Sequence, residues 1–328
     1  MPGLTIPGIP TTVLVAPDAF KETFDASRVA TAIGRGLERA GVPVDVCPIA
    51  DGGEGTLEVL APALGAEIRT ATVSDPLGRA IEAPFGIAGE TAIVEAAAAS
   101  GLHLVDQSER DPVRASTLGT GQLISAAVNA GARRVLVGVG GSATTDGGAG
   151  ATRALRGVEA DLVVLCDVRT PFEDAARVYG PQKGAGPEQV RTLTRRLNAQ
   201  ARRLPKDPRE VPMTGAAGGL AGGLWAACGG ELVPGAVFVL NTLGFDSRLR
   251  RARAAITGEG RLDEQSLAGK AISEVAVRAR QAGVPSHAIV GELALDAFGL
   301  RILDLQAVLE ASTLKEIESA GERLVGLL

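Results

Sequence analysis

Acidic residues follow directly after several apolar segments that have the character of buried β-strands. The segments VLVAP, VCPIA, LVVLC and AAITG precede Asp18, Asp51, Asp167 and Glu259, and a fifth apolar segment leads through a longer loop to Asp146. In open parallel sheets, ligands bind just beyond the carboxyl ends of the strands. Carboxylates hold Mg²⁺, and Mg²⁺ offsets phosphate charge, so five acids in these places indicate a metal–phosphate site. Because Asp also favours turns and helix N-caps, a structural role stays open for any one of them.

Two glycine-rich segments could bind an anion through the backbone. The thirteen residues 138–150 (GVGGSATTDGGAG) include six glycines, and glycine lets backbone N–H groups approach a phosphate without obstruction by Cβ. The spacing GVGGSA also fits the dinucleotide-binding fingerprint, which leaves an NAD-dependent dehydrogenase open as an alternative. In the second segment, 215–230, we expect a ligand loop over 215–219 and close packing through small residues beyond it.

Lysine is rare in this chain and is concentrated near these motifs. Of 33 basic residues only five are lysines. Lys183 (GPQKG) and Lys270 (AGK) lie in glycine-bearing motifs, and Lys21 lies in DAFK, just past the first predicted strand. A compact ammonium group suits phosphate oxygens, although chance placement of so few lysines is the alternative. Arg261, in GEGRLD, could form a forked contact with a carboxylate or a phosphate.

The composition excludes several classes of site and partner. The 328 residues include three cysteines without CxxC spacing and two distant histidines, so zinc cages, disulfide frameworks and HExxH helices are excluded. A net charge of −5 and 3% aromatic residues argue against a nucleic-acid partner. No segment approaches the ~20 apolar residues of a membrane span, and the N-terminus lacks signal-peptide character. We therefore expect no membrane association and a cytoplasmic location, and the oligomeric state stays open.

The order of elements predicts an α/β fold with two domains. Apolar strands alternate with glycine-rich turns and amphipathic helices, except over 68–95, where closely spaced strands suggest antiparallel pairing. We expect the first two strands to join the last three in one parallel sheet, and the middle of the chain to form an inserted mixed-sheet domain. The predicted domains are 1–66 with 232–328, and 67–231. The strands expected in the parallel sheet are 13–16, 44–50, 254–257, 286–290 and 300–309.

Several long motifs together resemble the type 1 glycerate kinase family. They are, in order, APDAFKETFDA, PIADGGEGTLEVL, DPLGRAIEAPFGI, GVGGSATTDGGAG, ACGGELVPG and ITGEGRLDEQSLAGKA. The resemblance implies ATP- and Mg²⁺-dependent phosphorylation of D-glycerate, with 2-phosphoglycerate favoured over 3-phosphoglycerate. It also implies a discontinuous flavodoxin-like domain, a second α/β domain and an active site between them. The chain departs from the family pattern at Ala19, Glu22 and Thr145, and it is shortened around 153–160 and after 168.

The resemblance suggests a role for each candidate residue. Asp51 and Asp146 would bind Mg²⁺, Asp18 would orient the substrate hydroxyl as a base, and Lys21 and Lys270 would neutralise phosphate oxygens. The substrate-binding residues would be Arg261, which would pair with the glycerate carboxylate, Glu259 and Asp263. The phosphate-binding residues would be Gly140, Gly141, Ser142, Lys183, Gly215, Gly218 and Gly219. A non-catalytic ligand-binding member of the family is the remaining alternative.

Overall fold

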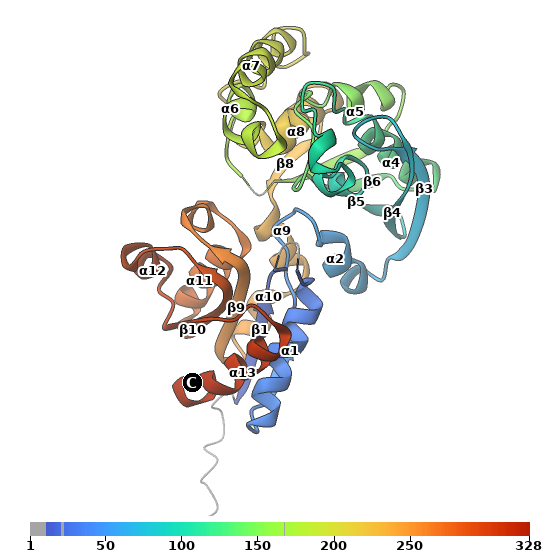
Figure 1. Cartoon of the computed structure of the whole chain (residues 1–328). Coiled ribbons are helices and arrows are strands. Elements are labelled where there is room, and N and C mark those ends of the chain that lie inside the picture. Colours follow the sequence, from blue (N-terminus) through green and yellow to red (C-terminus); the bar gives the residue numbers. More distant parts are fainter. Residues whose placement is uncertain (1–10, 21–22, 167) are drawn as a thin grey trace, which may run out of the picture. The chain divides into compact units, whose positions relative to one another are not determined.

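The structure, a computed structural model, describes residues 11–20, 23–166 and 168–328, and these form two compact units. The first unit comprises Met1–Ala50 and Leu240–Leu328, coloured blue and orange to red in Figure 1, and the second comprises Asp51–Val239. Each unit contains one β-sheet, so the α/β class with a discontinuous parallel sheet and an inserted mixed sheet is confirmed.

The compact units change at residues 50–51 and 239–240, whereas the predicted boundaries lie at 66–67 and 231–232. The difference arises at helix α2 (Thr56–Leu64), which packs against strands β4 (Ala80–Ala88) and β5 (Thr91–Glu95) of the mixed sheet. Its Leu57 side chain lies so close to Gly86 that a Cβ there would be 2.9 Å from Leu57 Cδ1. This apolar contact holds α2 in the second unit.

The first unit contains a parallel sheet in the order β11-β10-β9-β1-β2. Its strands are β1 (Thr12–Pro17), β2 (Val44–Val46), β9 (Ala252–Leu262), β10 (Ser286–Leu293) and β11 (Ala307–Glu310). The predicted joining of the first two strands to the last three is therefore confirmed. β1 is buried along nearly its whole length, as expected for a parallel strand covered on both faces.

Helices cover both faces of this sheet, as the labels in Figure 1 show. They are α1 (Ala26–Arg39), α10 (Phe245–Leu249), α11 (Ala271–Ala282), α12 (Ala297–Leu303) and α13 (Leu314–Leu324), with α9 (Gly235–Thr242) at the change of unit. Residues of α1 and α13 form one apolar core with Val13, Val15 and Ile289, and residues of α11 and α12 form another with Ala288 and Val290. Alternate residues of β10 thus pack against helices on opposite faces of the sheet.

Several strand predictions in this unit were wrong. β2 ends at Val46 and not at residue 50, and β10 continues to Leu293 and does not end at residue 290. β9 does not end at Thr257 but continues through Leu262, because Glu259 pairs in register with Val290 and Arg261 with Glu292 of β10. The segment 300–309 is not one strand. Helix α12 ends within it at Leu303 and is followed by its C-cap residue Asp304, which has φ +57°, and β11 begins only at Ala307.

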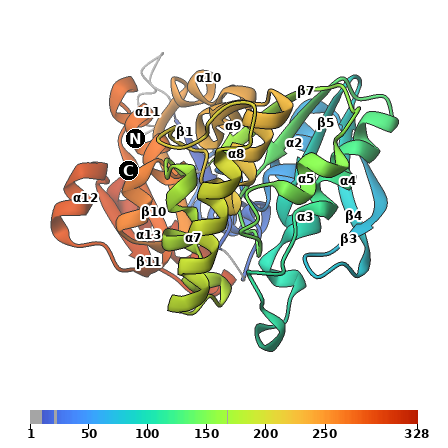
Figure 2. The ribbon, with the colours of Figure 1, turned by 90° about the horizontal axis from the view of Figure 1, so that it is seen from above.

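The second unit contains a sheet in the order β3-β4-β5-β6-β7-β8. β3 (Glu67–Ser74), β4 and β5 pair antiparallel, whereas β5, β6 (Arg134–Gly138), β7 (Asp161–Cys166) and β8 (Glu231–Pro234) pair in parallel, so the expected antiparallel insert is confirmed. The remaining helices, labelled in Figures 1 and 2, are α3 (Ala96–Ser100), α4 (Leu118–Asn129), α5 (Ala149–Ala154), α6 (Ala175–Tyr179), α7 (Pro187–Ala201) and α8 (Ala216–Cys228).

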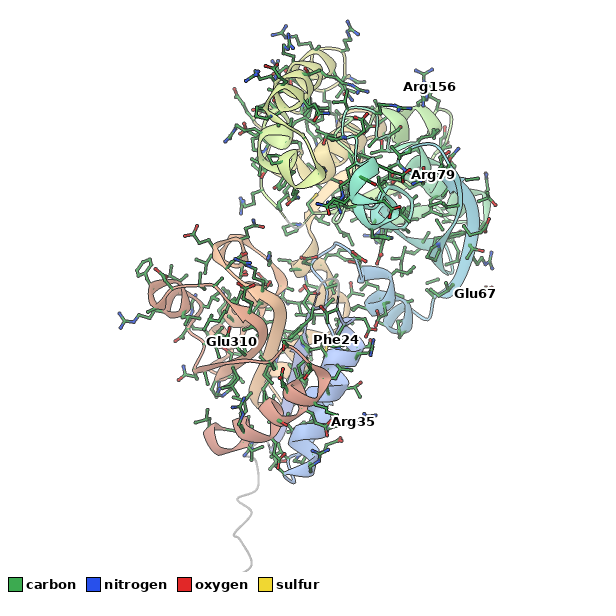
Figure 3. The ribbon with its side chains drawn as sticks, viewed as in Figure 1. Phe24, Arg35, Glu67, Arg79, Arg156 and Glu310 are labelled. Atoms are coloured by element: carbon green, nitrogen blue, oxygen red, sulfur yellow. The ribbon has the colours of Figure 1, made fainter. Side chains whose placement is uncertain are left out.

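The turn between β3 and β4 is organised by one buried carboxylate. Asp75 Oδ1 accepts the backbone N–H groups of Leu77 and Arg79, each at 2.8 Å. The Arg79 guanidinium, labelled in Figure 3, pairs with Asp75 and extends to Glu109 and to the Leu104 carbonyl at 3.0 Å. The turn is thus tied to the segment after α3, and the predicted turn at Asp75 is confirmed. No described helix has the length and apolar character needed to cross a membrane.

His287 makes the first unit sensitive to acid. It lies in β10 and is 2% exposed, and neither ring nitrogen has a hydrogen-bond partner within the described part of the chain. Burial lowers its pKa, so below about pH 6.5 the unfolded chain binds more protons than the folded chain. We expect the free energy of unfolding to fall as the pH drops below that value, and His287→Leu to remove this part of the loss.

Urea unfolding between pH 5 and 7.5 measures the free energy of unfolding at each pH. The effect of His287 is the difference between the wild type and His287→Leu in the slope of this free energy against pH. Exposed His103, replaced by Gln, is the matched control and should keep the wild-type slope. Equal slopes in the wild type and His287→Leu would contradict the role of His287.

Candidate active site

Most predicted residues of the first unit gather at the carboxyl ends of β1 and β9. The backbone N–H of Asp18 donates to the Gly258 carbonyl at 2.8 Å, which places Asp18 beside the second half of β9, next to Glu259. Asp18 is 7% exposed, and its Oδ1 accepts the Ala19 N–H at 2.7 Å. Lys21, predicted for the same edge, lies outside the described residues, as does Asp167 of the second unit.

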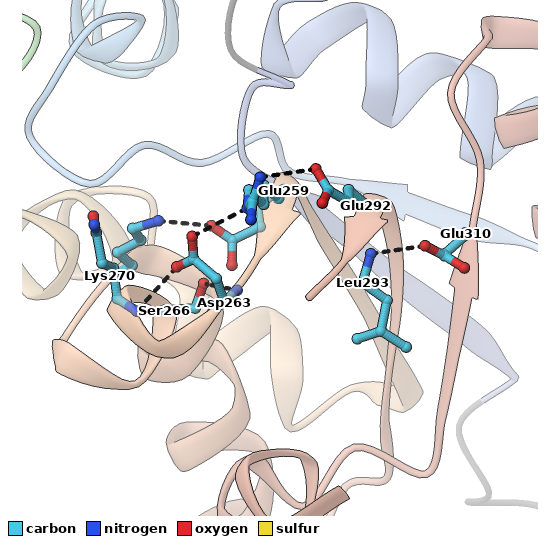
Figure 4. A network of polar contacts seen from close by, with 9 residues as sticks. Glu259, Asp263, Ser266, Lys270, Glu292, Leu293 and Glu310 are labelled. Carbon is cyan, nitrogen blue, oxygen red and sulfur yellow. Dashed lines mark hydrogen bonds and ion pairs between the residues drawn. The ribbon is translucent and has the colours of Figure 1, made fainter. Parts of the chain in front are cut away.

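Glu259 and Lys270 form an ion pair at this edge, drawn in Figure 4. Lys270 Nζ lies 3.3 Å from Glu259 Oε2. Burial raises the pKa of Glu259, and the Lys270 charge and a hydrogen bond to Ser266 only partly oppose this effect. The second oxygen, Oε1, is buried and has no hydrogen-bond partner within the described residues. This arrangement offers a fixed acceptor for a ligand hydroxyl beside a fixed cation.

Arg261 and Asp263 extend the polar network toward Glu292 of β10, and Figure 4 labels Asp263 and Glu292. Arg261 Nη1 lies 3.1 Å from Glu292 Oε2, and its Nε lies 3.4 Å from Asp263 Oδ2. Asp263 Oδ1 also accepts the Gln265 N–H at 2.9 Å. More than half of the Arg261 and Glu292 side chains is exposed, so their pairing contributes little stability and a ligand carboxylate could replace Glu292. Sequence reasoning missed Glu292, although it too is an acid near a strand end.

In the second unit, Asp51 begins a tight loop against the glycine-rich segment. Asp51 is 2% exposed, and its Oδ1 accepts the Gly53 N–H at 2.9 Å. The Thr56 hydroxyl donates to the Gly53 carbonyl at 2.8 Å, which joins the loop to helix α2. A Cβ on Gly140 would lie 2.5 Å from Gly53 Cα, so the two loops are in direct backbone contact. The structure thus places Asp51 next to the predicted phosphate loop.

Lys183 is buried against the glycine-rich loop. Its Nζ donates to Ser142 Oγ at 3.0 Å and to the Thr144 carbonyl at 2.6 Å, and the residue is 4% exposed. Gly141, which precedes Ser142, adopts φ +67°, a conformation that favours glycine. The lysine thus stabilises this loop through hydrogen bonds, and its predicted contact with phosphate stays a prediction.

The predicted loop 215–219 also packs on the glycine-rich segment. Gly218 has φ +66°, and a Cβ there would lie 2.0 Å from the Thr144 carbonyl oxygen. A Cβ on Gly219 would lie 2.8 Å from the Phe172 ring, and one on Gly215 would lie 2.4 Å from the Pro171 carbonyl oxygen. These glycines allow close contact between loops. Their predicted contact with phosphate stays a prediction.

Asp146 holds its loop together through both carboxylate oxygens. Oδ2 accepts from the Thr117 N–H and hydroxyl and from the Gly150 N–H at 2.9–3.0 Å, and Oδ1 accepts the Gly148 N–H at 3.1 Å. The residue is 2% exposed. These four hydrogen bonds tie the loop to the starts of α4 and α5, and they favour a positioning role over metal ligation.

We expect Asp146→Asn to lower the free energy of unfolding by about 2 to 4 kcal/mol, because the new amide group would face N–H donors. Urea unfolding without ligands measures this loss, and exposed Asp161, replaced by Asn, is the matched control. Unchanged stability combined with a raised Mg²⁺ requirement for activity would instead support Asp146 as a metal ligand.

The acidic residues offer Mg²⁺ a small set of ligands. Within the described residues there is no group of three or more His, Cys, Asp or Glu side chains that could hold a metal ion. Mg²⁺ is usually held by one or two carboxylates, with substrate phosphates and waters completing its shell. Asp51 suits such a site, because its hard oxygens lie beside the glycine-rich loop. Asp146 fits less well, because its oxygens already accept four hydrogen bonds.

The dinucleotide-binding alternative finds no support in the geometry of the loop. In that motif the helix begins at the glycines and directs its N-terminus at the pyrophosphate. Here α5 begins only at Ala149, well beyond Ala143, and it is six residues long. Lys183 and the loop 215–219 instead pack against the intervening residues.

Comparisons with known proteins agree on one family. The model of the glycerate kinase family matches residues 13–161 and 156–323. The chain is 39% identical over 326 residues to a glycerate kinase of Halalkalibacterium halodurans, covering 86% of both chains. It is 37% identical over 327 residues to the glycerate 2-kinase of Escherichia coli, covering 87% of this chain and 86% of the relative. A crystal structure of a protein assigned as glycerate kinase 2 of Salmonella typhimurium LT2 has a TM-score of 0.80 at 32% identity, covering 97% of this chain and 98% of that one.

Proposed function

Because the chain belongs to the glycerate kinase family and is a phosphotransferase, we propose that it transfers the γ-phosphoryl group of ATP to the 2-hydroxyl group of D-glycerate. Membership of a kinase family implies ATP, and a relative named glycerate 2-kinase supports the choice of hydroxyl. The site observation that carries the proposal is the Glu259–Lys270 pair, which combines a buried acceptor with a cation at the carboxyl end of the neighbouring strand β1.

Two residues of the first unit would recognise the substrate. Oε1 of Glu259 would accept a hydrogen bond from a glycerate hydroxyl, because it is buried without another partner in the described chain. Arg261 would exchange Glu292 for the glycerate carboxylate, since guanidinium groups bind carboxylates in a forked geometry. Asp263, 3.4 Å from Arg261, would keep the guanidinium oriented. The carboxylate of the substrate thus provides orientation while its hydroxyl remains available for reaction.

The reaction would require one proton transfer and one exchange of bonds to phosphorus. The glycerate oxygen forms a bond to the γ-phosphorus, and the bond from that phosphorus to the leaving oxygen of ADP breaks. The hydroxyl proton passes to the Asp18 carboxylate, which would act as the base. Lys21 and Lys270 would neutralise phosphate oxygens during transfer, when catalysis depends mainly on positioning and charge.

The second unit would hold the phosphates. The segment 140–142 and the loop 215–219 would direct N–H groups at phosphate oxygens, while Lys183 and Asp146 keep the first loop in shape. Mg²⁺ would be held by Asp51 together with phosphate oxygens and would neutralise their charge. Asp51 and Asp146 were both predicted as metal ligands. In this proposal, only Asp51 of the two would bind Mg²⁺.

A coupled assay of ADP release with D-glycerate tests the proposal. We expect turnover that requires both D-glycerate and Mg²⁺, and no turnover with 3-hydroxypropionate, which lacks the 2-hydroxyl. ATP and D-glycerate binding without ADP release would overturn the proposal in favour of a non-catalytic binding member.

A further inference from the structure

Helix α2 begins without a capping side chain of its own. Its N-cap residue, Gly55, has φ +92° and supplies no side-chain acceptor. The first N–H groups of a helix need external acceptors. Glu95 provides one, because its Oε1 accepts the Leu57 N–H at 2.6 Å and its carboxylate also accepts a backbone hydrogen bond from Gly55. A residue at the end of β5 thus caps a helix that begins almost forty residues earlier.

Glu95 lies where two loops of the proposed site meet. It is the register partner of Gly138, the last residue of β6, after which the glycine-rich loop begins. A Cβ on Gly138 would lie 2.8 Å from the Gly52 carbonyl oxygen, so this strand end touches the loop that begins at Asp51. Two residues after Glu95, the Ala97 Cβ would lie 3.4 Å from a Cβ on Gly141.

We propose that Glu95 is a positioning residue for phosphoryl transfer, because it ties the Asp51 loop to the strand end that borders the glycine-rich loop. This inference rests on the proposed function. Asp51 reaches α2 through only four residues, three of which are glycines without side chains to anchor them. The contacts of these three glycines therefore come from the backbone. The hydrogen bonds to Glu95 fix the far end of that backbone.

The charge of Glu95 should affect how firmly it holds the loop. Burial raises the pKa of Glu95 to about 7, the hydrogen bond from Leu57 opposes this, and the nearby charges of Glu54 and Glu58 add to it. An ionised carboxylate accepts hydrogen bonds more strongly than a neutral group. Turnover should therefore rise as the pH increases through 7, as Glu95 becomes ionised.

The test compares Glu95→Gln and Glu95→Ala with the wild type, using initial rates of ADP release from pH 5.5 to 8.5. In Glu95→Ala we expect kcat to fall by roughly 10- to 100-fold, since small displacements of reacting groups have effects of this size. KM should change much less. Glu95→Gln keeps an acceptor oxygen but cannot ionise, so its kcat should stay near the low-pH value of the wild type, above that of Glu95→Ala, and lose the inflection near pH 7.

Glu58→Gln is the matched control, because it removes an exposed carboxylate from the first turn of the same helix. It should keep the wild-type kcat and an inflection near neutral pH. A wild-type pH profile in Glu95→Gln would overturn the proposal, even if Glu95→Ala does not fold. Absence of glycerate phosphorylation by the wild type would instead contradict the proposed function.

Discussion

Replacing Lys270 with methionine is expected to lower kcat/KM for D-glycerate phosphorylation by roughly 10²- to 10³-fold, the effect typical of losing one transition-state charge contact. The ammonium group lies 3.3 Å from Glu259 and would face phosphate oxygens during transfer. Methionine keeps the length of the side chain but not its charge. Initial rates of ADP release under subsaturating substrate measure the effect.

Two control variants separate lost catalysis from lost folding. Exposed Lys315, replaced by Met, should keep the wild-type rate and stability. Lys270→Met alone leaves the buried Glu259 carboxylate without its cation, which should lower the free energy of unfolding. Adding Glu259→Gln should recover stability but not activity. If the single variant turns over at the wild-type rate, Lys270 does not act at the phosphates.

Replacing Gly218 with alanine is expected to lower the free energy of unfolding by about 3 kcal/mol or more. Gly218 has φ +66°, and a Cβ there would lie 2.0 Å from the Thr144 carbonyl oxygen, so the added methyl group strains the backbone and pushes against the glycine-rich loop. The rate of phosphoryl transfer should also fall, because the Thr144 carbonyl accepts the hydrogen bond from Lys183. Urea unfolding measures the first effect and ADP release the second.

Gly229 provides a closely matched control in the same helix. It has φ +72° at the C-terminus of α8, and a Cβ there would meet nothing within 4 Å. Gly229→Ala should therefore cost only the backbone strain, about 1 to 2 kcal/mol. If both variants lose the same free energy of unfolding, the contact between the two loops does not contribute to stability.

The sequence allowed much of the fold to be predicted, because buried parallel strands are short apolar runs bounded by glycine, proline and aspartate. Segments such as 13–16 and 134–139 have this form. The length of β9 was not predictable, since Gly258 and Gly260 suggest a turn and only pairing with β10 keeps the chain extended to Leu262. α12 was missed because its signals are the Asp296 N-cap and the left-handed Asp304 rather than its apolar pattern.

The candidate site was predictable as a set of residues but not as a set of roles. The acids at strand ends pointed to Asp18, Asp51 and Glu259, and the structure places Asp18 and Glu259 at one sheet edge. That Asp146 accepts four hydrogen bonds depends on Thr117, which lies far away in the sequence. Glu95 also follows an apolar strand, but its partners on α2 become visible only once the chain is folded.

The most direct test of the central claim is phosphorus NMR of the product formed from ATP and D-glycerate. We predict a phosphate monoester signal split into a doublet by a single neighbouring proton, which identifies 2-phosphoglycerate. A triplet, which identifies 3-phosphoglycerate, would contradict the assigned hydroxyl, and the absence of any new monoester signal would contradict the phosphorylation of glycerate altogether.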